Sequence, residues 1–128
     1  MAGVSKGAIG EVLAARFLRD KKYTILSSNF RCRQGEVDII AQDGQYIVFV
    51  EVKTRSSDSM YTAREAVTTA KQRKLIVTAG VYLSRFETKL QPRFDVVEVV
   101  TEPGSPAKVS EINHIIGAYE AGDLSGAF

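Results

Sequence analysis

The strongest constraint on the fold is residues 35–55, in which two apolar runs are joined by the dipeptide Asp43-Gly44. Both residues of this dipeptide tolerate positive φ, so the pattern predicts a tight turn and an antiparallel hairpin. With Asp43 and Gly44 as the two turn residues, Asp38 lies opposite Phe49. Both faces of the predicted strands are apolar, which is typical of central strands covered on both sides.

Four charged side chains gather on one face at the open end of this hairpin, because side chains alternate along a strand: Glu36, Asp38, Glu51 and Lys53. Asp38 and Glu51 become diagonal neighbours, roughly 7–8 Å apart at the backbone, so both carboxylates can reach one cation. Oxygen ligands without histidine or thiolate suit Mg²⁺ or Mn²⁺.

Lys53 lies next to this predicted metal site, where it can orient an attacking water or neutralise charge that develops on phosphorus. These groups together are suited to hydrolysing a phosphodiester. An alternative interpretation of the same residues is a salt-bridge patch with a purely structural role, because ion-pair networks also cluster charges.

A helix is predicted from Val4 to Lys21, and Glu11 lies near the middle of its widest apolar arc. Gly7 and Ala14, one turn to either side, leave room for something to approach this carboxylate. Glu11 therefore either faces a ligand or pairs with an internal arginine or lysine.

The remaining elements complete an α/β pattern: a strand from Lys22 to Phe30, a long helix from Ala63 to Ser84 capped by Thr62, a strand from Arg93 to Val100, and a short last helix from Ile112 to Tyr119. This order predicts a three-layer α/β sandwich in which helices flank a mixed central sheet.

Several charged residues outside the hairpin have two interpretations. Arg31 and Arg33 form a basic loop beside the carboxylates, where they are either solvated surface or phosphate contacts. Lys71, at the edge of the long helix, is placed to aim at an anionic ligand. Asp95 is either a further acid of the site or a partner of Arg93, and we favour the pairing.

The bulk properties exclude several classes of protein. With 128 residues we expect one domain over residues 1–120 and a flexible tail over residues 121–128. The net charge of +2 does not by itself indicate nucleic-acid binding. One cysteine excludes an internal disulfide, and a single histidine, His114, argues against a zinc site. We find no signal peptide or membrane span and expect a cytoplasmic protein.

The chain also resembles known proteins. Asp38 followed by Glu51-Val52-Lys53 is similar to the PD-(D/E)XK signature of restriction-endonuclease-like nucleases. A longer set of residues, in the same order, resembles the uncharacterised bacterial YraN-like family: Gly10-Glu11, Ala14, Leu18, Asn29, Gly35-Glu36-Val37-Asp38, Phe49 to Arg55, Lys71 and Arg93-Phe94-Asp95. The match extends from Lys6 to Tyr119. Met60-Tyr61-Thr62 stands where the family usually has an aromatic-glycine pair.

The resemblance implies the restriction-endonuclease-like fold and a metal bound by the carboxylates of Asp38 and Glu51 and the backbone carbonyl of Val52. Lys53 would be the catalytic lysine. Glu11 would be the helix-borne acid that joins the site in related Holliday-junction resolvases, and Lys71 would support the site or touch phosphate.

The resulting hypothesis is an Mg²⁺- or Mn²⁺-dependent nuclease acting on DNA, with branched or repair intermediates as candidate substrates. Arg31, Arg33, Arg55 and Lys71 would contact phosphates. A homodimer would allow both strands to be cut together. The alternative is a nucleic-acid-binding or protein-interaction module that keeps the fold without turnover.

Overall fold

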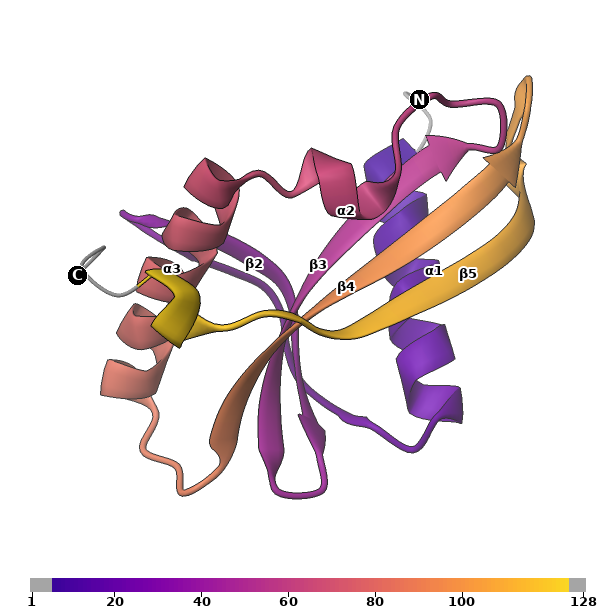
Figure 1. The fold of residues 1–128 in the computed structure, drawn as a ribbon. Coiled ribbons are helices and arrows are strands. Elements are labelled where there is room, and N and C mark those ends of the chain that lie inside the picture. Colours follow the sequence, from indigo (N-terminus) through magenta and orange to yellow (C-terminus); the bar gives the residue numbers. More distant parts are fainter. Residues whose placement is uncertain (1–5, 125–128) are drawn as a thin grey trace.

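The computed structural model describes residues 6–124, which form one five-stranded sheet with helices on both faces (Figure 1). The elements are, in chain order, α1 (Lys6–Asp20), β1 (Thr24–Cys32), β2 (Gly35–Asp43), β3 (Tyr46–Ser56), α2 (Ala63–Ala66), α3 (Thr69–Arg85), β4 (Gln91–Glu102), β5 (Ser105–Tyr119) and the 3₁₀ turn η1 (Ala121–Leu124). The strand order is β1-β2-β3-β4-β5, and only the β3–β4 pair is parallel. The predicted mixed sheet is confirmed.

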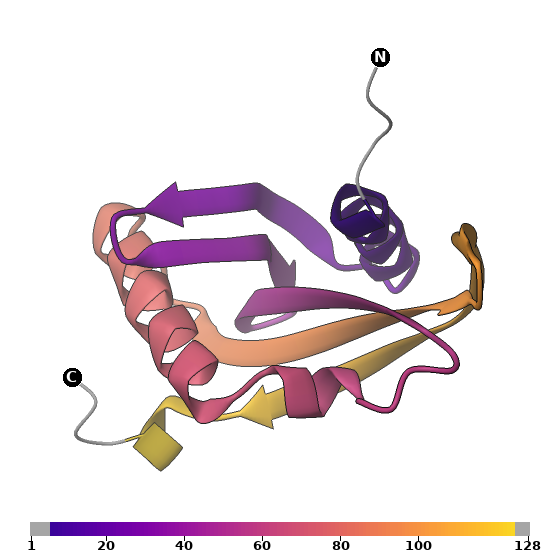
Figure 2. The same cartoon turned by 90° about the horizontal axis from the view of Figure 1, so that it is seen from above.

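Two hydrophobic cores lie on opposite faces of the sheet, so the molecule has three layers (Figure 2). On one face, α1 packs Ala14 and Leu18 against the middle of the sheet. On the other face, α3 contributes Leu75, Ile76, Ala79 and Tyr82 to a core that contains Phe49 and Phe94. Strands covered on both sides explain the unbroken apolar runs in the sequence.

The β2–β3 turn lies one residue later than predicted. Asp43 pairs with Tyr46, so Gly44 and Gln45 are the turn residues, and Gly44 has φ +58°. Positive φ at the first central position alone is the pattern of a type II′ turn, which favours glycine there. Every pair consequently shifts by two positions, and Ile40 rather than Asp38 lies opposite Phe49. An even shift keeps each side chain on its predicted face.

Strands β2 and β3 separate in the middle of the sheet. Their ladder ends at the pair Ile39–Val50, whereas β2 stays paired with β1 as far as Gly35. The β1–β2 arm therefore turns away from β3 and toward α3 (Figure 1). Strict alternation along β2 would put Val37 on the same face as Ile39, but on this arm it packs into the α3 core instead. The predicted alternation fails there because the arm no longer follows the main sheet.

The predicted helix from Ala63 to Ser84 is wrong in one respect, because it is interrupted at Val67-Thr68. Thr68 has extended backbone angles and its hydroxyl accepts a hydrogen bond from the Lys71 N–H, so it begins α3 as an N-cap. Thr62 caps α2 as predicted, since its hydroxyl accepts from the Glu65 N–H.

The predicted last helix over residues 112–119 is wrong, because this segment belongs to strand β5. The spacing of the isoleucines in this segment is compatible with a helix or with a strand. Pairing with β4 lets two polar side chains of β5 reach buried acids. Asn113 donates to Glu98, and His114 contacts Asp95. Tertiary partners therefore override the local pattern.

The ends of the chain bear on two further predictions. The predicted helix start at Val4 lies outside the described residues, and α1 runs from Lys6. Within the predicted tail, Ala121–Leu124 form η1, and residues 125–128 lie outside the described part. Within residues 6–124, no helix is long and apolar enough to cross a membrane.

Candidate active site

The charged face predicted from the hairpin forms the wall of an open pocket of about 380 Å³, which we call the carboxylate pocket. It lies where β2 and β3 separate, and α3 closes its other side. The lining side chains that carry charge are Glu36, Asp38, Glu51, Lys53, Lys71 and Lys74. The structure thus brings together the four hairpin residues and Lys71. It adds Lys74, which the sequence places within the apolar stripe of the long helix and for which we expected only an aliphatic stem on the core and an ammonium group in water.

Asp38 replaces a backbone hydrogen-bond acceptor that is missing where β2 and β3 separate. Its Oδ2 accepts from the backbone N–H of Val52 at 2.7 Å. In a continued ladder this N–H would face β2, so the carboxylate replaces a strand partner at the split. The bond holds Asp38 beside Glu51 and uses only one of its oxygens.

The two carboxylates stand in surroundings that disfavour their charges. Burial raises the pKa of Asp38 to about 6, against the effect of the Val52 hydrogen bond, and the nearby Glu11 carboxylate raises it further. Burial also raises the pKa of Glu51 to about 7, and the charge of Asp38 adds to this rise. Two carboxylates that lie close together, with little positive charge to balance them, form a suitable binding site for a cation.

Lysines provide the pocket's positive charge. Lys53 Nζ lies 3.1 Å from Glu51 Oε1, and both side chains are largely buried. Burial acts to lower the pKa of Lys53, but a hydrogen bond with Lys71 and the neighbouring carboxylates outweigh this effect and raise it. The same contact with Lys53 lowers the pKa of Lys71. Of the two amines, Lys53 therefore holds its proton more tightly.

Glu11 reaches Asp38 from the opposite side, because α1 approaches β3 very closely. A Cβ on Gly10 would collide with the Thr54 hydroxyl, so glycine is what allows this approach. Glu11 interacts with Asp38 but lines a neighbouring groove rather than the carboxylate pocket. No ion pair links Glu11 to an arginine or lysine whose side chain the structure describes, and its contact with a ligand stays a prediction.

The predicted phosphate-contacting arginines lie outside this pocket. Arg31 is exposed and pairs with Glu36 at 3.1 Å, and Arg33 is exposed at the β1–β2 turn. Arg55 pairs with Glu98 at 2.8 Å, and both of these side chains are largely buried. Their contact with nucleic acid remains a prediction, and the pairing of Arg55 makes it the weakest of the three.

The donor set fits a hard divalent cation in part. Within the described residues, no three histidine, cysteine or carboxylate side chains form a metal-binding group. Asp38 and Glu51 nevertheless supply two carboxylates, and the backbone carbonyl of Val52 is the third ligand that the family resemblance implies. Mg²⁺ is commonly held by one or two carboxylates, with water and substrate oxygens filling the other positions.

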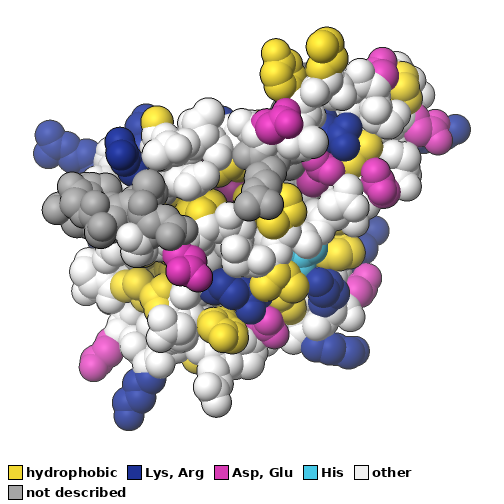
Figure 3. Space-filling model, viewed as in Figure 1, with side chains coloured by type: hydrophobic (Ala, Val, Ile, Leu, Met, Phe, Trp, Pro, Cys, Tyr) yellow, Lys and Arg dark blue, Asp and Glu magenta, His cyan; other side chains and the backbone are white. Residues whose placement is uncertain are grey.

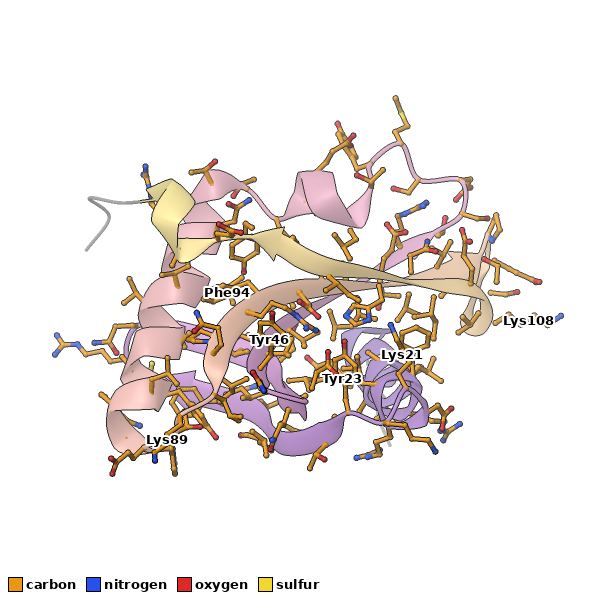
Figure 4. All side chains as sticks on the ribbon, turned by 60° about the horizontal axis from the view of Figure 1, so that its bottom comes forward. Lys21, Tyr23, Tyr46, Lys89, Phe94 and Lys108 are labelled. Carbon is orange, nitrogen blue, oxygen red and sulfur yellow. The ribbon has the colours of Figure 1, made fainter. Side chains whose placement is uncertain are left out.

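A second buried charge cluster, which we call the Arg93 network, lies on the α1 face of the sheet. Asp95 pairs with Arg93 as predicted, with its two oxygens 2.9 Å from the guanidinium nitrogens. The network extends from these two residues to His114, Asp43, Tyr23, Lys21 and the Gly117 N–H. Figure 4 shows Lys21 and Tyr23 beside α1, and the Tyr46 ring lies against Arg93, whose guanidinium carbon is 5.0 Å from the ring centre.

His114 is fixed inside this network. Its Nε2 lies 2.7 Å from Asp95 Oδ2, and its Nδ1 lies 2.8 Å from Lys21 Nζ. Because an ammonium can only donate, Nδ1 accepts from Lys21, and Nε2–H donates to Asp95. These two hydrogen bonds hold the His114 ring in one orientation.

Comparison with known proteins places these residues in a family. The model of the uncharacterised protein family UPF0102 matches residues 10–99, which include Glu11, Asp38, Glu51, Lys53 and Lys71. The chain belongs to this family. The YraN-like resemblance seen in the sequence is thereby confirmed.

Full-length relatives agree with this assignment. The UPF0102 protein of Caldanaerobacter subterraneus subsp. tengcongensis is 44% identical over 114 residues, which cover 88% of this chain and 93% of the relative. That of Symbiobacterium thermophilum is 51% identical over 104 residues, 80% of this chain and 86% of the relative. That of Geotalea uraniireducens is 44% identical over 117 residues, 91% and 90% of the two chains. The names of these relatives do not state an activity.

Proposed function

We propose that this UPF0102 protein is a divalent-metal-dependent nuclease that hydrolyses DNA phosphodiesters. The observation that carries the proposal is the carboxylate pocket, in which two acids with raised pKa values lie beside Lys53 and face Lys71 and Lys74 of α3. The similarity of Asp38 and Glu51-Val52-Lys53 to the PD-(D/E)XK signature supports the same chemistry.

Asp38 and Glu51 would hold the cation together with the Val52 carbonyl, and Glu11 would support the site through Asp38. A bound Mg²⁺ or Mn²⁺ supplies Lewis acidity and lowers the pKa of bound water. The hydrogen bond from the Val52 N–H fixes one oxygen of Asp38, so its other oxygen is oriented before any ligand arrives.

Lys53 would stabilise negative charge on the reacting phosphate. Its ammonium is anchored 3.1 Å from Glu51, which keeps it at the pocket floor rather than in solvent. A fixed cation in a partly buried site stabilises developing charge without reorganising when the reaction occurs. It also positions the attacking water, for which it offers a hydrogen-bond donor.

Lys71 would position the substrate from α3. It is exposed at the pocket mouth, beside Lys53, where an incoming phosphate meets both amines. On the face seen in Figure 3, basic and acidic side chains are interspersed rather than gathered in one basic patch. Affinity for DNA would therefore depend on local contacts such as Lys71 more than on a long-range field.

The test is cleavage of labelled single-stranded, duplex, flapped and four-way-junction DNA in Mg²⁺, Mn²⁺ and EDTA. We expect cleavage that needs metal and falls by at least about 100-fold in Lys53→Ala, because a catalytic charge is removed. Lys74→Ala is the matched control, since Lys74 also lines the pocket but is exposed on α3. Equal rates for the parent and Lys53→Ala would contradict the assigned role of Lys53.

Binding of Mn²⁺ gives an independent readout of the metal site. A ligand that binds only the native state raises its melting temperature, so Mn²⁺ is expected to stabilise the parent but not Asp38→Asn or Glu51→Gln. Isothermal titration with Mn²⁺ measures the same difference directly. Unchanged Mn²⁺ affinity in both variants would show that these carboxylates are not the ligands.

A second candidate function is a non-catalytic DNA-binding or protein-interaction module. The observation that favours it is that no three carboxylate, histidine or cysteine side chains within residues 6–124 form a metal-binding group. On this alternative, junction or flap DNA would be retarded in a gel in Ca²⁺ without cleavage in any metal. The homodimer needed to cut two strands together stays a prediction, testable by sedimentation with and without DNA.

A further inference from the structure

A second depression adjoins the carboxylate pocket on the other side of Asp38. It is a groove of about 280 Å³ between α1 and the β1–β2 hairpin, which we call the α1 groove. Asp38 lines both depressions, and Glu11 lines the α1 groove. A ligand that enters the carboxylate pocket from the side of α3 can therefore extend past Asp38 into the α1 groove.

Asn29 lies in this groove in an unusual backbone conformation. It occupies the rung of the β1–β2 ladder between the pairs Ser28–Ile39 and Phe30–Val37, and so stands across from Asp38. Its φ is +55°, in the left-handed region that non-glycine residues seldom adopt. Residues held in such conformations cluster at functional sites.

The amide of Asn29 is available to a ligand. The side chain is exposed and makes no hydrogen bond within the part of the chain that the structure describes. An amide offers both a donor and an acceptor, which suits a phosphate oxygen, a sugar or a base edge.

Arg19 provides positive charge at the outer end of the groove. It lies eight residues after Glu11 on α1, about 12 Å further along the helix axis, and Ala15 lies between them on the same side. Arg19 is exposed and forms no ion pair with any residue whose side chain the structure describes. It is therefore free to bind an anion, unlike Arg31 and Arg55.

We infer that a DNA strand extends from the carboxylate pocket over Asp38 into the α1 groove, where Arg19 and Asn29 hold the nucleotide next to the scissile phosphate. This inference rests on the proposed function, because the scissile phosphate is placed by the carboxylate pocket. It makes Arg19 a phosphate contact and Asn29 a sugar or base contact. Glu11 then lies beneath the strand, next to Asp38.

The experiment measures binding of fluorescent single-stranded oligonucleotides by anisotropy, with Ca²⁺ in place of Mg²⁺ so that turnover does not interfere. We expect Arg19→Ala to weaken binding of a twelve-nucleotide strand by about fivefold to tenfold and to reduce the salt slope by about one. Asn29→Gly removes the amide while keeping the left-handed backbone unstrained, and is expected to weaken binding by about threefold.

Two controls separate a groove contact from a general effect. Arg16→Ala removes the same charge from the same helix, but Arg16 is exposed outside the groove, so binding should stay within about twofold. A dinucleotide is too short to occupy both depressions, so the parent and Arg19→Ala should bind it equally. Melting temperatures of all variants show whether Arg19 acts merely through the end of α1, where a cation is favourable.

The outcomes distinguish this inference from the proposed function. Cleavage by the parent with unchanged binding in Arg19→Ala and Asn29→Gly overturns the groove inference and leaves the nuclease standing. Weakened binding in both variants, without cleavage by the parent in Mg²⁺ or Mn²⁺, supports the groove and overturns the nuclease. A parent that binds no DNA overturns both.

Discussion

Two acids of the sheet, the half-buried Asp38 and the buried Asp95, have opposite electrostatic surroundings although only one strand separates them. Asp95 is fully buried on the α1 face and is contacted by Arg93, by His114 and by the Gly117 N–H. Burial acts to raise its pKa, but these hydrogen bonds outweigh it and lower the pKa. Asp38 is less buried, yet its pKa is raised.

The difference lies in the partners rather than in the burial. Asp38 has one backbone donor and two neighbouring carboxylates, whereas every contact of Asp95 is a donor. A satisfied buried network stabilises a fold, and an unbalanced pair of acids destabilises it unless a ligand intervenes. The contacts of Asp95 are those of a structural network, whereas a function for the carboxylate pocket stays a proposal.

The largest expected effect is the loss of stability on breaking the Arg93 network. Asp95→Asn should lower the free energy of unfolding by about 3–5 kcal/mol, because it leaves Arg93 buried with too little negative charge. Urea denaturation at pH 7 measures this change. The matched control is Asp43→Asn, which removes the half-exposed partner of Arg93 and should cost less than about 1 kcal/mol. Equal costs for the two variants would show that burial does not distinguish them.

The carboxylate pocket should respond with the opposite sign. Glu51→Gln and Asp38→Asn are expected to raise the free energy of unfolding by about 1–2 kcal/mol at pH 8 in EDTA, because each removes a charge that burial disfavours. The same urea experiment measures this gain. Destabilisation by both variants would make the pocket a salt-bridge patch, the alternative that the sequence left open.

The pH dependence sharpens the same contrast. In EDTA, Asp38 and Glu51 keep their protons in the native state to about pH 6 and 7, whereas in the unfolded chain they ionise near pH 4. The native state thus binds more protons across this window, so stability should fall as pH rises from about 4 to 7. Thermal melts from pH 4 to 8 measure the trend, which Glu51→Gln should flatten.

Asp95 contributes in the other direction. Its pKa is lowered in the native state, so its contribution is present above the pKa of an unfolded aspartate and is lost as pH falls below that value. Melts of the parent and Asp95→Asn below pH 4 should therefore converge. A constant difference between them at all pH values would contradict the ionic nature of the network.

The smallest expected effect concerns the close approach that brings Glu11 to Asp38. Gly10→Ala should lower the free energy of unfolding by about 1 kcal/mol, since the new methyl group displaces the Thr54 side chain. Gly80→Ala in α3 is the control, because its Cβ would meet open space and should stabilise the helix by up to about 1 kcal/mol. Stabilisation by both substitutions would show that α1 does not need glycine at residue 10.

Much of the carboxylate pocket was predictable because it depends on strand alternation. Glu51 and Lys53 keep their predicted face along β3, and an error of one residue in the turn did not change it. Asp38 lies beyond the last β2–β3 pair and is held at the pocket by the Val52 N–H. Lys71 was predictable from its place at the edge of a helix. The α/β class followed from the order of apolar periods along the chain.

Local patterns failed where a tertiary partner decided the conformation. Residues 112–119 have a spacing that fits a helix, but Glu98 and Asp95 draw Asn113 and His114 into a strand. The break between α2 and α3 depends on the Thr68 cap, which competes with a continuous helix that the composition allows equally well.

The sequence by itself determined which charges share a face, because alternation along a strand is a property of the backbone. Only the tertiary structure decided that β2 pairs with β3 from Ile39 onward and not before it, which leaves the Val52 N–H to Asp38 and opens the pocket. It also decided that α1 approaches β3 closely at Gly10, which brings Glu11 near Asp38, and that Asn29 and Arg19 border the same groove. These features join segments distant along the chain, so no local period encodes them.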